Sequence, residues 1–214
     1  MPIWHAIGRQ LEHPRGAWGH VTGAAMRLVN GRPNALAIEA LDIAADHAVL
    51  DLGCGPGATV AAMARRAPLG VVHGVDQSAA MIAQAARANR RALQSGHVCL
   101  AQARFEQLPY HDASIDRILA SNIVYFWRDV GAVVAEMLRV LRPGGRIVIY
   151  ATDAAAMKGW KFAGPETHRL FDAASLAAAL RHGGFDERDI AVRRVRISGS
   201  IEGLIAVVSP GSAR

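Results

Sequence analysis

The chain has 214 residues, of which 51% are hydrophobic and 20% are charged. This composition fits one ordered α/β domain and excludes a chain that is disordered along its length. The net charge of +6 comes from arginines scattered along the chain instead of one basic block, which disfavours a nucleic-acid-binding tract.

The cysteines and histidines show no metal-ligand spacing, so the sequence predicts no metal site. Cys54 and Cys99 are both expected inside core elements. No leader peptide is recognisable, and no apolar run approaches ~18 residues. We therefore expect a cytoplasmic protein, either a monomer or a homodimer.

Residues 1–47 are predicted to form a helical N-terminal extension that could cover an active site. Helices are expected near residues 18–30 and 34–45. Between them, Asn30-Gly31 is predicted to turn with positive φ, and Pro33 is predicted to begin the second helix.

From residue 48 to residue 208, short β-branched runs alternate with helical patterns, which is typical of a Rossmann-like α/β core. We expect a seven-stranded, mostly parallel sheet with an antiparallel last strand and helices on both faces. The predicted strands are 48–52, 70–76, 97–102, 115–122, 146–151, 188–197 and 203–208, and the predicted helices are 57–66, 78–94, 128–141 and 172–182.

A glycine-rich turn, Gly53, Gly55 and Gly57, follows the first core strand, where ligands of open α/β sheets usually bind. The spacing alone also satisfies a dinucleotide-binding pattern. Asp51 favours a different ligand, because its charge about 4 Å from a diphosphate would repel by roughly 4 kcal/mol before screening. A cationic or zwitterionic group is favoured instead. Asp76, at the end of the second strand, is placed to accept hydrogen bonds from ribose hydroxyls.

Four segments resemble the class I S-adenosylmethionine-dependent methyltransferases, most closely the small-molecule branch related to the ubiquinone and menaquinone biosynthesis enzymes. They are VLDLGCGPG (49–57), VHGVDQS (72–78), LPYHDASIDRILASN (108–122) and MLRVLRPGGRIVI (137–149). The resemblance implies S-adenosyl-L-methionine as cofactor and S-adenosyl-L-homocysteine as product.

The same resemblance implies which residues would hold each part of the cofactor. The methionine part would lie at Asp51, Gly53, Gly55 and Gly57, the ribose at Asp76, the adenine at Gln77, Met81, Phe105 and Glu106, and the methyl group near Ser121 and Asn122. Arg104-Phe105 departs from the family pattern of Asp or Asn followed by a small residue, so Glu106 is the candidate acceptor for the adenine amino group.

The acceptor is expected to be a small organic molecule, methylated mainly by being held in line with the sulfonium. Tyr125 and Trp127 could wall its pocket or anchor the following helix. Trp18, Trp160 and Phe162 are further tentative substrate contacts, and His20 and Tyr125 are weak candidates for a catalytic base.

Two other classes of function remain open at this stage. An RNA methyltransferase would share the cofactor fold, although SNIVY lacks the two prolines expected of enzymes that methylate exocyclic base amines. A nicotinamide-dependent oxidoreductase is disfavoured by Asp51, and by lysines only at Lys158 and Lys161, which leave no Tyr-x-x-x-Lys pair. A non-catalytic module that binds the cofactor or a protein partner is the remaining alternative.

Overall fold

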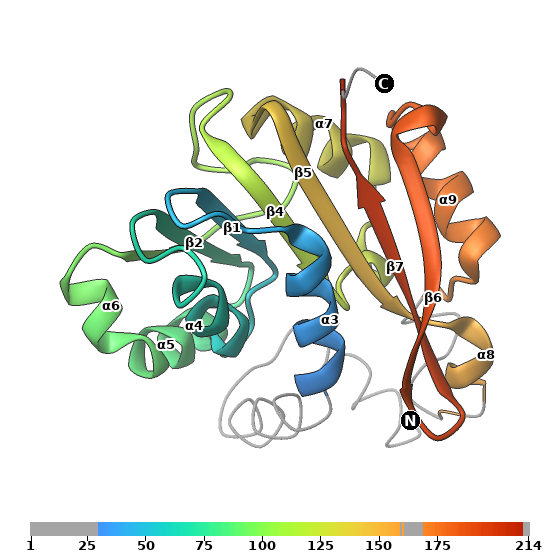
Figure 1. Ribbon diagram of the computed structural model, residues 1–214, viewed down its shortest axis with the longest axis horizontal. Helices are drawn as coiled ribbons and strands as arrows, with labels where there is room; N and C mark the ends of the chain where they lie inside the picture. Colours follow the sequence, from blue (N-terminus) through green and yellow to red (C-terminus); the bar gives the residue numbers. More distant parts are fainter. Residues whose placement is uncertain (1–29, 159, 161–168, 212–214) are drawn as a thin grey trace.

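A computed structural model of the chain describes residues 30–158, 160 and 169–211. The predicted helix at 18–30 therefore lies almost wholly outside the described residues. Within them, a twisted sheet is flanked by helices, and the chain enters it through one helix, α3 (Figure 1).

The sheet has seven strands in the order β3-β2-β1-β4-β5-β7-β6. The strands β1 to β5 run parallel to one another, while β7 runs antiparallel to both β5 and β6. This confirms the predicted mostly parallel sheet with an antiparallel last strand. The strand bounds are β1 Ala48–Leu52, β2 Val71–Asp76, β3 Val98–Gln102, β4 Ile115–Ser121, β5 Leu141–Thr152, β6 Ile190–Ser198 and β7 Ile201–Val208.

Helices cover both faces of the sheet, as predicted. One hydrophobic cluster joins alternate strand residues to α3, α4 and α5, and a second joins the opposite strand residues to α7 and α9. The helix bounds are α3 Gly31–Leu41, α4 Ala58–Ala64, α5 Ala79–Ala88, α6 Arg90–Gln94, α7 Val130–Val140, α8 Ala154–Met157 and α9 Ala173–His182, with short 3₁₀ turns η1 Val124–Phe126 and η2 Glu187–Asp189.

The predicted single helix at 78–94 is wrong, because Asn89 divides it into α5 and α6. The Asn89 side chain is buried and donates both to Gly57 O (3.0 Å) and to Ala85 O (2.9 Å). These bonds fix the residue at φ −113°, outside helical geometry, and join α5 to the glycine turn.

The helix predicted at 34–45 begins earlier and ends earlier, at Gly31 and Leu41. Asn30 is its N-cap, with φ −92° instead of the predicted positive value. Pro33 lies in the first turn instead of at its start, a place where a missing N–H costs no helical hydrogen bond.

Cys54 is buried as expected, but Cys99 is exposed. Cys99 lies in β3, which forms one edge of the sheet. No helix in the described part of the chain is long and apolar enough to cross a bilayer.

Candidate functional site

A cavity of about 350 Å³ opens at the carboxyl ends of β1, β2 and β4, where the first strand-to-helix turn meets the sheet. All but one of the residues predicted to hold a cofactor line it: Asp51, Gly53, Gly55, Asp76, Gln77, Met81, Phe105, Glu106, Ser121 and Asn122. Gly57 does not belong to the cavity wall formed by the described residues. The residues predicted from separate sequence segments therefore come together around one cavity.

Each of the three glycines of the turn is needed for a different structural reason. A Cβ on Gly53 would lie 2.5 Å from Ile123 Cγ2, and one on Gly57 would lie 2.7 Å from Ala85 Cα. Gly55 would meet no atom within 4 Å, since it faces the cavity. Gly53 and Gly57 thus allow close packing, whereas Gly55 keeps the turn open to a ligand.

Asp51, on β1, is 2% exposed and lies in the cavity wall. Its Oδ2 atom has no hydrogen-bond partner among the described residues. Burial, and secondly the charge of Asp76, raise the pKa of the Asp51 carboxyl to about 8. A buried acceptor of this kind requires a donor, and a cationic donor would restore its ionised form.

Asp76 ends β2 and faces the glycine turn. Its Oδ2 accepts a hydrogen bond from Gly55 N (2.9 Å), and its Oδ1 accepts one from Ser78 N (2.8 Å). These two bonds fix the plane of the Asp76 carboxylate. The geometry is compatible with the predicted acceptance of two hydroxyl groups.

The loop after β3 contributes Arg104, Phe105 and Glu106 to the cavity wall. Phe105 is buried, whereas the Arg104 side chain is largely exposed. Arg104 Nε lies 3.4 Å from Glu106 Oε2, a partly exposed ion pair of small energetic value. Glu106 therefore lies at the cavity with a carboxylate that could accept from a ligand.

At the other end of the cavity, polar side chains join β4 to α3. Ser121 Oγ donates to Asn34 Oδ1 (2.7 Å), and Asn122 Nδ2 donates to Asn30 Oδ1 (3.0 Å). Asn34 in turn donates to Thr59 on α4 (3.0 Å). Sequence reasoning missed Asn30, Asn34 and Thr59, which also line the cavity.

Tyr125 and Trp127 were predicted either to wall the acceptor pocket or to anchor the following helix, and neither belongs to the wall that the described residues form around the cavity. Both side chains are buried in the core, because the η1 turn directs them away from the cavity. The Tyr125 hydroxyl donates to Asn122 Oδ1 (3.1 Å) and accepts from Thr152 N. Tyr125 thus supports the wall from behind, and the nearby Phe126 lines the cavity instead.

None of the other residues predicted to contact the methyl acceptor is found in the cavity wall that the described residues form. Trp160 packs against the core and is absent from the described cavity wall. Trp18, His20 and Phe162 lie outside the described residues. Sequence reasoning also passed over Arg128, an exposed residue that lines the cavity next to the β4 end. The described part of the chain holds no group of three or more residues that could bind a metal ion.

Residues 50–149 match the family model of the methyltransferase domain. An uncharacterized methyltransferase of Bacillus subtilis, YdaC, is 28% identical over 176 residues, which cover 82% of this chain and 92% of YdaC. The trans-aconitate 2-methyltransferase of Pseudomonas aeruginosa is 30% identical over 134 residues, 61% of this chain and 42% of the relative. The chain spans only 33% and 40% of the length of two Streptomyces relatives that it matches.

Solved structures share the fold. A SAM-dependent methyltransferase from Aquifex aeolicus superposes with a TM-score of 0.69 at 18% sequence identity. The superposition covers 95% of this chain and 97% of that one. At this identity the likeness establishes the Rossmann-like architecture and leaves the ligands to be argued from the site.

Proposed function

We propose, from the premise that residues 50–149 are a methyltransferase domain, that the chain transfers the methyl group of S-adenosyl-L-methionine to a small organic acceptor. S-adenosyl-L-homocysteine would be the product. Relatives named trans-aconitate 2-methyltransferase, which act on a small organic acid by name, support this class of acceptor.

The observation that carries the proposal is the buried, unpartnered Oδ2 of Asp51 beside the glycine turn. An α-ammonium group would supply the missing donor and would stabilise the ionised carboxylate. A diphosphate in the same place would be repelled by the charge of Asp76, by roughly 4 kcal/mol at about 4 Å before screening, and would keep Asp51 protonated instead of supplying the donor that its carboxylate needs. The turn therefore suits the amino-acid end of a nucleoside and rejects a dinucleotide.

The rest of the cavity suits the same ligand. Asp76 would accept from the ribose hydroxyls, and Gln77 and Met81 would flank the adenine ring. Phe105 and Glu106 would meet its edge. The methionine part would cross the open face of Gly55 and bring the sulfonium toward Ser121 and Asn122, which belong to the same cavity wall.

When bound, the cofactor supplies a sulfonium-activated methyl group, so the protein mainly has to orient it and exclude water. The side chains at the β4 end serve orientation: Ser121 and Asn122 are already held by hydrogen bonds from α3. In the described part of the wall, this end carries neutral amides and hydroxyls and the guanidinium of Arg128, but no carboxylate or histidine. Methyl transfer promoted by positioning is the chemistry that these groups support.

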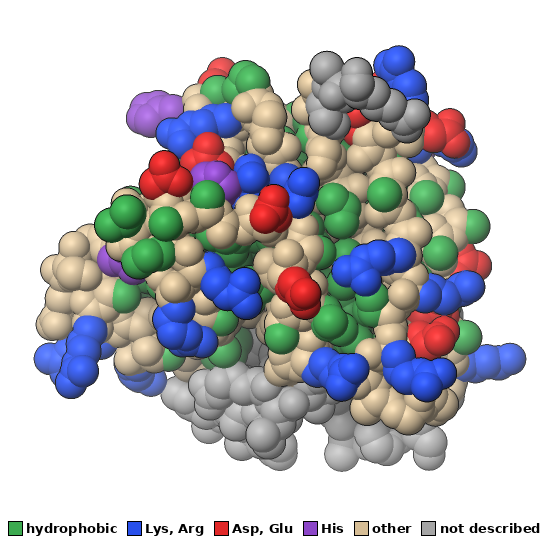
Figure 2. Space-filling model, in the orientation of Figure 1, with side chains coloured by type: hydrophobic (Ala, Val, Ile, Leu, Met, Phe, Trp, Pro, Cys, Tyr) green, Lys and Arg blue, Asp and Glu red, His purple; other side chains and the backbone are tan. Residues whose placement is uncertain are grey.

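An RNA acceptor is disfavoured by where the basic side chains lie. Arg65 and Arg66 follow the end of α4, and Arg87, Arg90 and Arg91 belong to the end of α5 and to α6. Both α4 and α5 contribute to the cavity at their first turns, so these arginines lie at the opposite ends of the helices. Figure 2 shows basic side chains over the α5 and α6 region. Two other arginines, Arg104 and Arg128, do belong to the cavity wall.

Isothermal titration calorimetry tests the proposal. Micromolar, one-to-one binding of S-adenosylmethionine and of S-adenosylhomocysteine is expected, with no binding of NAD. The reverse pattern would refute it. Methyl transfer from labelled cofactor to a panel of small carboxylic acids, amines and thiols then separates an enzyme from a non-catalytic module, which would bind the cofactor and methylate none of them.

A further inference from the structure

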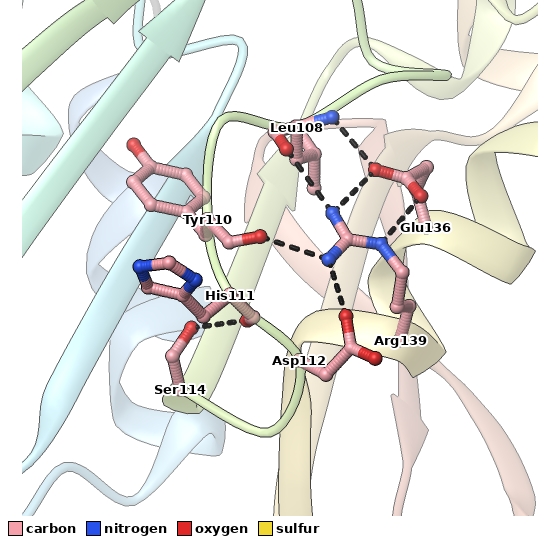
Figure 3. Close-up of polar contacts among 7 residues, drawn as sticks. All are labelled: Leu108, Tyr110, His111, Asp112, Ser114, Glu136 and Arg139. Carbon is pink, nitrogen blue, oxygen red and sulfur yellow. Dashed lines mark hydrogen bonds and ion pairs between the residues drawn. The ribbon is translucent and has the colours of Figure 1, made fainter.

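The guanidinium group of Arg139, on α7, binds three residues of the loop between β3 and β4, residues 103–114. Arg139 Nε and Nη2 form a bidentate pair with Glu136 (2.7 and 2.8 Å). Its remaining N–H groups donate to Leu108 O (3.1 Å), Tyr110 O (2.8 Å) and Asp112 Oδ1 (2.7 Å) (Figure 3). All five donors of the arginine side chain are therefore used: three bind carboxylate oxygens and two bind backbone carbonyls of the loop.

Glu136 completes the connection from the other side. It lies one helical turn before Arg139 on α7 and accepts a hydrogen bond from Leu108 N (2.7 Å). Leu108 is thus held at both its amide and its carbonyl by one ion pair (Figure 3). The Arg139 hydrogen bonds are the main reason that the pKa of Glu136 is lowered, so the pair is ionised at neutral pH.

Leu108 is only two residues after Glu106, which lines the cavity. Two backbone hydrogen bonds hold the first half of the loop. Ala103 N donates to Asp76 O and Gln107 N donates to Arg104 O, both at 3.2 Å. The backbone from Phe105 to Gln107 therefore runs between the end of β2 and the anchored Leu108, with the Phe105 side chain buried in the core between these two points.

We propose that Arg139, acting through Glu136 and Leu108, is a positioning residue that sets the part of the cavity wall which distinguishes adenine from other bases. This inference rests on the proposed function. A lysine could not replace the arginine, because an ammonium has three donors and no planar fork. Arg139 touches no ligand itself, so its effect would be seen in base selectivity and not only in stability.

The probe is S-adenosylhomocysteine and its analogue with hypoxanthine as the base, which exchanges the amino donor at position 6 for an oxygen. The wild type is expected to bind the adenine form much more tightly, since a site built to accept from the amino group rejects an analogue lacking it. In Arg139→Lys, the ratio of the two dissociation constants should shrink by about tenfold, the equivalent of losing one hydrogen bond to a charged group.

Arg142→Lys is the matched control. Arg142 binds Ala113 O in the loop (3.3 Å) and Asp116 at the start of β4 (2.7 Å), and among the described residues it makes no hydrogen bond with residues 103–108. In Arg142→Lys, the ratio of the dissociation constants for the hypoxanthine and adenine forms should equal the wild-type ratio, measured well below the unfolding temperature. A ratio in Arg139→Lys that equals the wild-type ratio, whatever its melting temperature, would overturn the positioning role.

Hydrogen exchange on the wild type gives a second test that does not depend on a variant folding. If Arg139 fixes residues 105–107, the amide hydrogens of Gln107 and Leu108 should exchange through the same opening reaction. Their protection factors and the dependence of exchange on denaturant should then be the same. Much faster exchange at Gln107 would overturn the proposal. Failure of the wild type to bind S-adenosylhomocysteine would overturn the proposed function itself, whereas the two results above overturn only the role of Arg139.

Discussion

Cofactor binding should expel a proton from Asp51. With a pKa of about 8, this carboxyl is about nine-tenths protonated at pH 7 in the protein alone. An ammonium group bound against it favours the carboxylate, so binding should shift the pKa well below 7. The cause lies in the structure, because Asp51 is 2% exposed and its Oδ2 lacks a partner among the described residues.

The size of the effect on cofactor affinity follows from the pKa of Asp51. Ionising a carboxyl of pKa about 8 at pH 7 costs about 1.4 kcal/mol, which weakens the apparent affinity about tenfold relative to a fully ionised site. Because the ionised fraction of Asp51 increases with pH, affinity should rise by roughly fiftyfold from pH 6 to pH 8 and level off above that. In Asp51→Asn this pH dependence should disappear.

Calorimetry at pH 7 in two buffers of different ionisation enthalpy measures the protons released. The wild type should release about 0.9 proton for each S-adenosylhomocysteine bound, the protonated fraction of the free carboxyl. Asp51→Asn should release almost none and bind about 2 kcal/mol more weakly at pH 8, where the wild-type charge is available. No proton release by the wild type, or equal release by the variant, would show that Asp51 does not meet the ammonium.

Three further changes test other parts of the site. Asp76→Ala should weaken cofactor binding by about 3 kcal/mol, measured by calorimetry, and unchanged affinity would mean that the ribose lies elsewhere. Gly57→Ala should lower the free energy of unfolding by about 2 to 4 kcal/mol because its Cβ would overlap α5, whereas Gly55→Ala should cost about 1 kcal/mol and mainly weaken binding; equal destabilisation in urea would contradict this. Tyr125→Phe should cost about 1 to 3 kcal/mol in the same assay, since Thr152 N loses its acceptor, and a neutral change would show that this bond contributes nothing.

The strands and the glycine turn could be predicted from sequence because their signals are local. The run AVLDL forms β1 at the predicted residues, and the three glycines all adopt positive φ. Asp51 and Asp76 could be placed at one edge because the carboxyl ends of neighbouring parallel strands meet there.

The contribution of α3 could not be predicted, because it depends on contacts between residues far apart in the chain. Ser121 meets Asn34 across 87 positions, and Asn122 meets Asn30 across 92. No local pattern pairs these amides with β4. The Asn-Gly pair instead suggested a turn, whereas the asparagine caps a helix whose first turn faces the cavity.

The aromatic residues after β4 show a second limit. Tyr125, Phe126 and Trp127 are consecutive, and only the 3₁₀ turn decides which of them faces the cavity. The sequence favoured the two that are buried and passed over Phe126, which lines the wall. Residue type alone does not give the direction of a side chain in such a short turn.

A crystal structure of the chain with S-adenosylhomocysteine would test the central claim most directly. The α-ammonium should lie within hydrogen-bond distance of Asp51 Oδ2, with the ribose hydroxyls on Asp76. Placement of the ligand with its carboxylate or another anionic group against Asp51, or its absence from this cavity altogether, would contradict the account.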